Sequence, residues 1–186
     1  MGASYRTTSI TDRMMRAARL DSQVYEEVEH DLSATSQALT VVIITAVAAG
    51  IGHAVGELMG GHPGRAVGGF IGGVGAALLG WVIWSLVSYF VGTKLFGGIA
   101  TPGELLRTIG FAHAPGIINV ILFIPILGGL IGIVVAVWQL IATIVAMRQA
   151  LDIDTGKAVL TALVGMIPAA FLSLVLIGPF MLLFGR

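Results

Sequence analysis

The sequence predicts an all-α integral membrane protein whose chain crosses the bilayer several times. Hydrophobic residues make up 56% of its 186 positions, charged residues make up 11%, and the mean hydropathy is +0.97. About a quarter of the residues of a soluble domain are charged, so the composition excludes an ordinary soluble fold. Charge placement points the same way: half of the twenty charged residues precede residue 32, and the others leave four long charge-free stretches.

Net charge and residue usage narrow the possible functions. The net charge is zero, so the chain lacks the basic surplus of a nucleic-acid binder, and we expect no nucleic-acid partner. The absence of cysteine excludes disulfides, thiolate metal sites and iron–sulfur clusters. Phosphate-loop, His-Glu-x-x-His and Gly-x-Ser-x-Gly motifs are also absent. We therefore expect neither enzymatic activity nor a bound cofactor.

The N-terminal segment, residues 1–35, is predicted to be a cytoplasmic leader with one amphipathic helix over residues 10–32. Two interpretations of its early arginines are open: contact with anionic lipid headgroups, or the solvated face of a short helix. These arginines are Arg13, Arg16 and Arg19. The acidic run that follows is either a docking patch for a basic partner or another solvated face. It consists of Glu26, Glu27, Glu29 and Asp31.

The charge-free stretches set the number of spans, because a transmembrane helix needs about 20 apolar residues. Three stretches of 25 to 28 residues hold one helix each. The 40-residue stretch between Arg107 and Arg148 holds two, divided at Pro125. The sequence therefore predicts a domain of five transmembrane helices over residues 36–186, with spans at 37–56, 67–94, 107–124, 127–148 and 158–184. Pro115 and Asn119 leave open whether the third span is kinked or re-entrant.

Loop charges predict the orientation of these five spans. Eight of the ten Lys and Arg residues fall on one side, which places the N-terminus in the cytoplasm and the C-terminus outside.

The cytoplasmic loop before the third span contains a helix start. Thr101 is the expected N-cap, Pro102 takes the first helical position, and Glu104 can complete a capping box.

Small residues recur every four positions along the second span. In lipid, helices associate through such residues because they let two backbones approach closely. We expect the row to pack span two against its neighbours, with a homodimer seam as the alternative. The row consists of Gly64, Gly68, Gly72, Ala76 and Gly80, and Gly128 and Gly132 repeat its spacing in the fourth span.

Polar residues are few within the spans. Asn119 and Gln139 are expected to form interhelical hydrogen bonds, whereas Trp81 and Trp138 are expected to face lipid or the interface. A His/Glu group after the first span has a spacing that suits a divalent cation only weakly. We interpret it as a wet helix end and expect no metal; its members are His53, Glu57 and His62.

Several short segments resemble prokaryotic members of the Yip1 family of membrane proteins. The resemblance covers roughly residues 24–165 and is most specific over 100–158. It is carried by residues that include Tyr25, Glu26, Glu27, Glu104, Arg107, Gly110, Pro115, Pro125 and Arg148. It implies five spans with a cytoplasmic N-terminus. Eukaryotic relatives bind small GTPases in Golgi and endoplasmic-reticulum membranes, but this chain lacks their Asp-Leu-Tyr-Gly-Pro and Gly-Tyr-Gly elements.

Two functional hypotheses follow. The first is a non-enzymatic scaffold or accessory subunit in a prokaryotic plasma membrane, which contacts lipid and packs against a partner membrane protein or against itself. The second is a small transporter or channel with a broken-helix site in the bilayer. That site would be built around Pro115, Asn119, Pro125 and Gln139.

Overall fold

The computed structural model describes residues 9–184, and every regular element in this range is a helix. This confirms the predicted all-α class. The elements are α1 (Ile10–Ala18), α2 (Ser22–His30), α3 (Ala34–Met59), α4 (Pro63–Leu95), α5 (Pro102–Ala112), the 3₁₀ helix η1 (Ala114–Ile121), α6 (Leu127–Ala150) and α7 (Thr155–Phe184).

Within the described residues, four helices are long and apolar enough to cross a membrane. They are Ala34–Met59, Pro63–Leu95, Leu127–Ala150 and Thr155–Leu176. Charge-free stretches therefore located four of the five expected spans. Large apolar side chains on the outer faces of these helices are exposed, including Val67, Ile133 and Phe171. Such surfaces suit contact with lipid.

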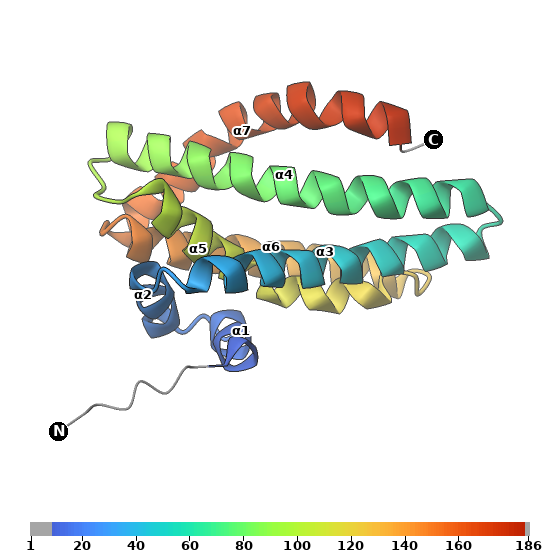
Figure 1. Ribbon diagram of the computed structural model, residues 1–186, viewed down its shortest axis with the longest axis horizontal. Coiled ribbons are helices and arrows are strands. Elements are labelled where there is room, and N and C mark those ends of the chain that lie inside the picture. Colours follow the sequence, from blue (N-terminus) through green and yellow to red (C-terminus); the bar gives the residue numbers. More distant parts are fainter. Residues whose placement is uncertain (1–8, 185–186) are drawn as a thin grey trace.

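The third expected span is a broken helix. Pro115 has no N–H and its ring crowds the carbonyl four residues earlier, which explains why α5 stops at Ala112 and the chain continues as η1. Together, α5 and η1 run beside α3 from one end of the bundle to the other, and α6 returns (Figure 1). The segment that sequence left open is thus kinked along the length of the bundle.

The leader contains two helices, so the prediction of one helix over residues 10–32 is wrong. The chain turns at residues 19–21, where Leu20 adopts a left-handed backbone with φ of 62°. Asp21 then caps α2 by accepting a hydrogen bond from the Gln23 N–H at 3.0 Å. A helical periodicity that continues through the turn hid this break.

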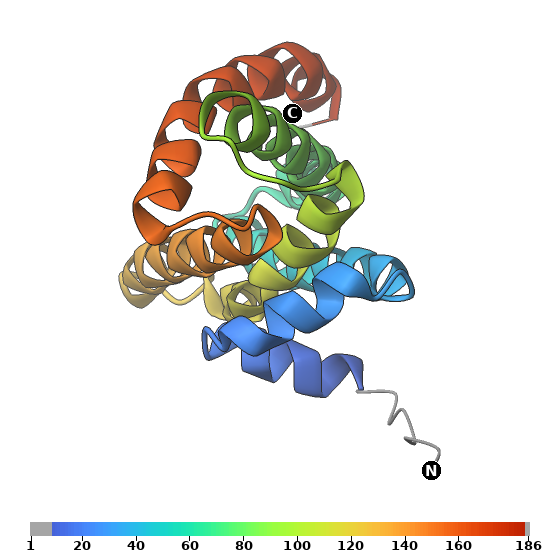
Figure 2. The same ribbon diagram turned by 90° about the vertical axis from the view of Figure 1, so that its left-hand side faces the viewer.

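Both leader helices lie against one end of the bundle, where they contact α5, α6 and η1 (Figure 2). We call this the leader end, and the opposite end, with the turns at 60–62 and 122–126, the far end (Figure 1). One hydrophobic core joins leader and bundle at the leader end. Its fully buried members include Tyr25, Leu105, Phe111 and Met147.

Candidate functional site

The leader end contains a buried ion-pair cluster centred on Arg13. This side chain is 5% exposed and donates hydrogen bonds to Glu27 at 2.7 Å and Asp31 at 2.8 Å. It also donates to Gln37 of α3 at 2.9 Å, which ties both leader helices to the bundle. Neither sequence interpretation, lipid contact or a solvated face, applies to Arg13, because its partners lie in its own chain.

Arg16 extends this cluster. It donates to Asp21 at 2.8 Å and to Glu27 at 2.9 Å. The hydrogen bond from Arg16 holds the pKa of the Asp21 carboxyl below its usual range. Much of the acidic run is therefore occupied by the arginines that precede it, and only part of it faces solvent.

Arg107 connects α5 to the leader. This α5 side chain is 5% exposed, and its Nε donates to the carbonyl oxygens of Val28 and Glu29 at 3.0 and 3.1 Å. Its Nη2 also donates to the Glu29 carbonyl. These carbonyls belong to the last turn of α2, which has no further helical N–H to bond. A cation at the C-terminus of a helix also complements the helix dipole. Arg107 thus fixes α2 to α5.

Glu29 carries a buried carboxyl oxygen without a hydrogen-bond partner at the leader end. Its residue is 6% exposed, and Oε2 has no hydrogen-bond partner in the described structure. Burial, followed by the neighbouring Glu26 charge, raises the pKa of the Glu29 carboxyl to about 7. A carboxyl with this pKa changes its protonation state near neutrality.

Other family-motif residues hold helices in place. Thr101 and Glu104 form the predicted capping box, with the Thr101 N–H donating to Glu104 Oε2 at 2.8 Å. At Gly110, an added Cβ would lie 2.7 Å from the Ala38 Cβ, so α5 and α3 are in close contact there. Arg148, by contrast, donates to its neighbour Gln149 Oε1 at 3.0 Å within α6.

Two tryptophans that are expected to face lipid or the interface donate hydrogen bonds to other helices. Trp81 is buried, and its Nε1 donates to the Leu106 carbonyl at 3.1 Å, joining α4 to α5. Trp138 is half-buried, and its Nε1 donates to the Ala18 carbonyl at 2.8 Å, joining α6 to α1. Sequence gave no signal for these bonds, because their partners are backbone carbonyls 25 and 120 residues away.

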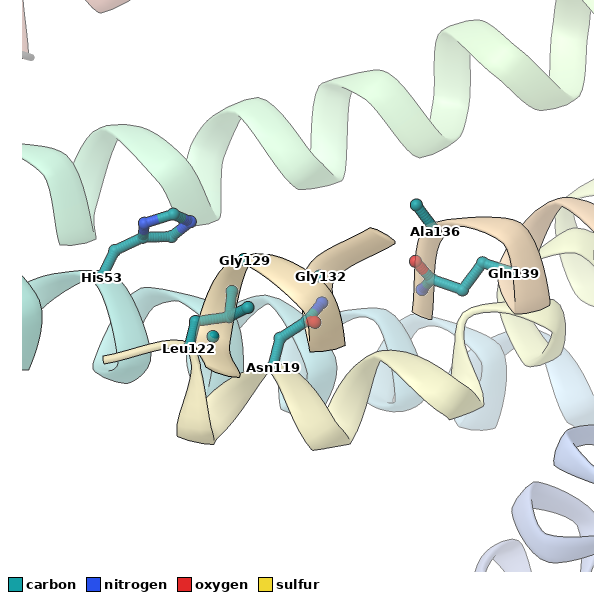
Figure 3. A pocket seen from close by; sticks show the side chains of 8 residues that line it. His53, Asn119, Leu122, Gly129, Gly132, Ala136 and Gln139 are labelled. Carbon is teal, nitrogen blue, oxygen red and sulfur yellow. The ribbon is translucent and has the colours of Figure 1, made fainter. Parts of the chain in front are cut away.

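The far end contains a cavity of about 410 Å³ beside the broken segment. Its lining includes His53, Asn119, Leu122, Gly129, Gly132 and Gln139 (Figure 3). Asn119 and Gln139 of the predicted broken-helix site therefore share one cavity. Pro115 is buried outside its lining, and Pro125 lies exposed in the following turn.

Hydrogen bonding distinguishes the two amides of this cavity. Gln139 Nε2 donates to the His113 carbonyl at 3.2 Å, which confirms the interhelical bond expected for this residue. The side chains of Asn119 and His53 form no hydrogen bond with any described residue, so the interhelical bond expected for Asn119 is not observed. Two of the polar side chains that line the cavity, those of Asn119 and His53, thus have hydrogen-bonding capacity that no described residue uses.

The turn that closes this cavity is strained. Ile126 has φ of 66° and ψ of −54°, and the Leu127 N–H donates back to the Pro125 carbonyl at 2.7 Å. This is a γ-turn of the disfavoured hand. At Gly128 an added Cβ would collide with the Leu122 carbonyl, so glycine is required where α6 begins.

A second cavity of about 330 Å³ lies between α3 and α4. His53, Glu57, Arg65, Gly69 and Gly73 are among its lining residues, so His53 lines both cavities. Glu57 lies 3.6 Å from the His62 ring. The described residues contain no group of three or more His, Asp or Glu side chains placed to hold a metal ion.

The small-residue row of α4 shows a mixed environment. Gly72 is buried, but an added Cβ at Gly64 or Gly80 would meet nothing within 4 Å. The described residues therefore make no close packing contact at these two positions. Whether another helix occupies them stays a prediction.

Long apolar helices, outward-facing hydrophobic side chains and a polar leader end define a multi-pass, all-helical membrane protein. The Yip1 domain family model matches residues 22–177, from the first residue of α2 through most of α7. The chain belongs to the Yip1 family, as its motifs indicated. No curated protein and no solved structure matches it.

Proposed function

We propose that the chain is a non-enzymatic membrane scaffold or accessory subunit that crosses a prokaryotic plasma membrane five times. The leader end lies in the cytoplasm and the far end outside. Two observations support this topology: α5 and η1 together extend along the bundle (Figure 1), and the described cations gather at the leader end. Arg65 is the described cation of the far end, as the positive-inside rule requires of a translocated loop.

The main support for the proposal is the set of contacts that the family-motif residues make. Glu27 neutralises Arg13, Glu104 caps α5, and Arg107 bonds the end of α2. Glu27 and Arg107 fix one helix to another, and Glu104 fixes the start of its own helix. A family whose motif residues serve this purpose acts through the surface that they shape, which is how a scaffold works.

A partner surface is supplied by the open part of the α4 row. Gly64 and Gly80 leave room for a close helix, and in lipid such small-residue faces drive association through backbone contact. The partner is a second copy of this chain or a helix of another membrane protein.

Cysteine crosslinking tests this partner surface without background, because the chain contains no cysteine. A single Gly80→Cys variant in native membranes should crosslink to a second copy or to one stoichiometric partner. The control is Leu174→Cys on α7, where the side chain is 72% exposed and faces lipid. Equal crosslinking of the two variants would contradict the scaffold proposal. A reporter fused after Arg186 that is active in the cytoplasm would contradict the topology.

The second candidate function, a small transporter or channel, is favoured by one observation: Asn119 and Gln139 line one cavity beside a broken helix. Solute flux through proteoliposomes that is abolished by Asn119→Leu would support it. Vesicles as tight as protein-free ones toward ions and small solutes would exclude it.

A further inference from the structure

Two polar side chains of the far end lack hydrogen-bond partners among the described residues. Asn119 and His53 face the 410 Å³ cavity and form no hydrogen bond with a described residue (Figure 3). His53 is exposed and Asn119 is half-buried, so a molecule outside the chain can reach both side chains. Two polar side chains with unused hydrogen-bonding capacity on one cavity can therefore hold a ligand that supplies the partners.

Charged groups lie next to this cavity. Arg65 and Glu57 line the second cavity, and Arg65 forms no ion pair or hydrogen bond with any described residue. His53 lines both cavities and so connects the charged site to the amide site. Glu57 and Arg65 offer one negative and one positive group to the same space.

Beyond the amides, the lining is small and apolar. Gly129, Gly132 and Ala136 of α6 form the floor of the larger cavity (Figure 3). An added Cβ at Gly129 would meet nothing within 4 Å, so the floor is open above this residue. From the turn of α3 and α4 inward, the lining passes from charged to polar to apolar.

We propose that the far end binds one phospholipid whose headgroup is zwitterionic and carries a primary amine. Arg65 pairs with the phosphate and Glu57 with the ammonium group, while Asn119 donates to an ester carbonyl of the glycerol region. An acyl chain covers the glycine floor. Charge, hydrogen bonding and apolar surface occur in the same order along such a lipid as along the two cavities. This site is independent of the scaffold function and assigns the cavity a bound lipid in place of a solute path.

Native mass spectrometry of the full-length protein tests the proposal by titration with phosphatidylethanolamine. Phosphatidylglycerol is the anionic arm, and glycerophosphoethanolamine is the arm with the headgroup but no acyl chains. We expect one tightly bound phosphatidylethanolamine, weaker binding of phosphatidylglycerol, and no binding of the chain-free headgroup at the same concentrations.

A pair of leucine variants locates the site. Gly129→Leu fills the floor of the cavity, whereas Ala170→Leu adds a leucine on an exposed part of α7 that lines neither cavity. Gly129→Leu should weaken phosphatidylethanolamine binding about tenfold or more, because a leucine occupies the volume of the acyl chain. Ala170→Leu should bind as the parent does.

Two variants of the exposed charges test the headgroup contacts without disturbing the core. Arg65→Gln should weaken both phospholipids about tenfold, the effect of losing one charge-assisted hydrogen bond. Glu57→Gln should remove the preference for phosphatidylethanolamine over phosphatidylglycerol. The proposal is overturned by a parent protein without stoichiometric lipid, by equal binding of both lipids, by equally tight binding of the chain-free headgroup, or by unchanged binding in Gly129→Leu.

Discussion

The two ends of the bundle are built in opposite ways. At the leader end, residues from α1 to α7 share a core in which side chains as large as Tyr25 and Phe111 are fully buried. The buried cations Arg13 and Arg107 have several hydrogen-bond partners each. At the far end, two cavities, a strained turn and a 3₁₀ helix replace such packing. Polar side chains there, including Asn119, face open space.

This difference shows where several polar family-motif residues act, whereas Pro125 of the same set lies in the far-end turn. Tyr25, Glu27, Glu104 and Arg107 all lie at the leader end, and each holds a helix in place. The far end is built instead from glycines and a few polar side chains. One end therefore fixes the shape of the molecule, and the other leaves room for a ligand.

The largest expected effect comes from removing the Arg107 side chain. Arg107→Ala leaves the buried carbonyls of Val28 and Glu29 without donors, so we expect a loss of about 3 kcal/mol in the free energy of unfolding. Denaturing-detergent titration measures this loss. Arg65→Ala at the far end is the control and should change stability little, because Arg65 is exposed and unpaired within the described chain. Equal losses for both variants would remove the distinction between the ends.

Glycine-to-alanine variants compare a position in close helix contact, Gly110, with a position in open space, Gly80. Gly110→Ala places a Cβ 2.7 Å from the Ala38 Cβ, and such overpacking costs about 1–3 kcal/mol. Gly80→Ala meets no atom within 4 Å and gains helix propensity, so it should be neutral or slightly stabilising. Thermal unfolding of the purified variants gives both values. If Gly80→Ala were destabilised and Gly110→Ala were unaffected, the result would contradict the claim that Gly110 is closely packed and Gly80 is not.

The Glu29 carboxyl predicts a pH dependence at the leader end. Its pKa is raised to about 7, so the folded state favours the protonated form, and the attachment of α2 weakens as the pH rises from about 5 to 7 and above. His30 acts in the same direction, because a hydrogen bond to the Glu26 carbonyl raises its pKa. Glu104 and Asp152, which face Glu29 from α5 and from the turn before α7, add to the repulsion when Glu29 is ionised.

The test is limited proteolysis of the leader between pH 5.5 and 8. The parent should be cleaved faster at the higher pH, and Glu29→Gln, which cannot ionise, should show a smaller dependence on pH. Asp21 and Asp31 have lowered pKa values, so their stabilising contribution is lost only below about pH 4, outside this range. An identical pH profile in Glu29→Gln would show that another group titrates.

The smallest effect concerns the capping box. Thr101→Ala removes the acceptor for the Glu104 N–H and should cost about 1 kcal/mol. Thr101→Ser, which keeps the hydroxyl, is the matched control and should retain most of the stability. Thermal unfolding of the two variants distinguishes loss of the cap from loss of the methyl group.

Sequence reasoning succeeded where the signal is local. Stretches without charge located four long helices, and the capping box at Thr101 was read from residues three positions apart. The turn at Leu20 was missed, because a non-glycine residue with positive φ has no reliable sequence mark. The bonds of Arg107 and Trp138 join residues 78 to 120 apart, and only the packing of the helices brings those partners together.

The cavity residues were found in part. Asn119 and Gln139 were singled out as rare polar groups within apolar spans, and both line the cavity. His53 was instead grouped with Glu57 and His62, because sequence spacing relates it to its own helix alone. Its position between two cavities depends on how α3 is placed against α4 and α6.

Distances between paired spin labels test the contrast between the two ends most directly, since the chain has no native cysteine to interfere. One pair joins Gln23 of α2 to Lys157 of α7 at the leader end, and the other joins Met59 to Leu127 at the far end; all four side chains are exposed. In lipid-free detergent we expect a narrow distance distribution for the leader pair and a broader one for the far pair. Distributions of equal width, or a broader one at the leader end, would contradict the account.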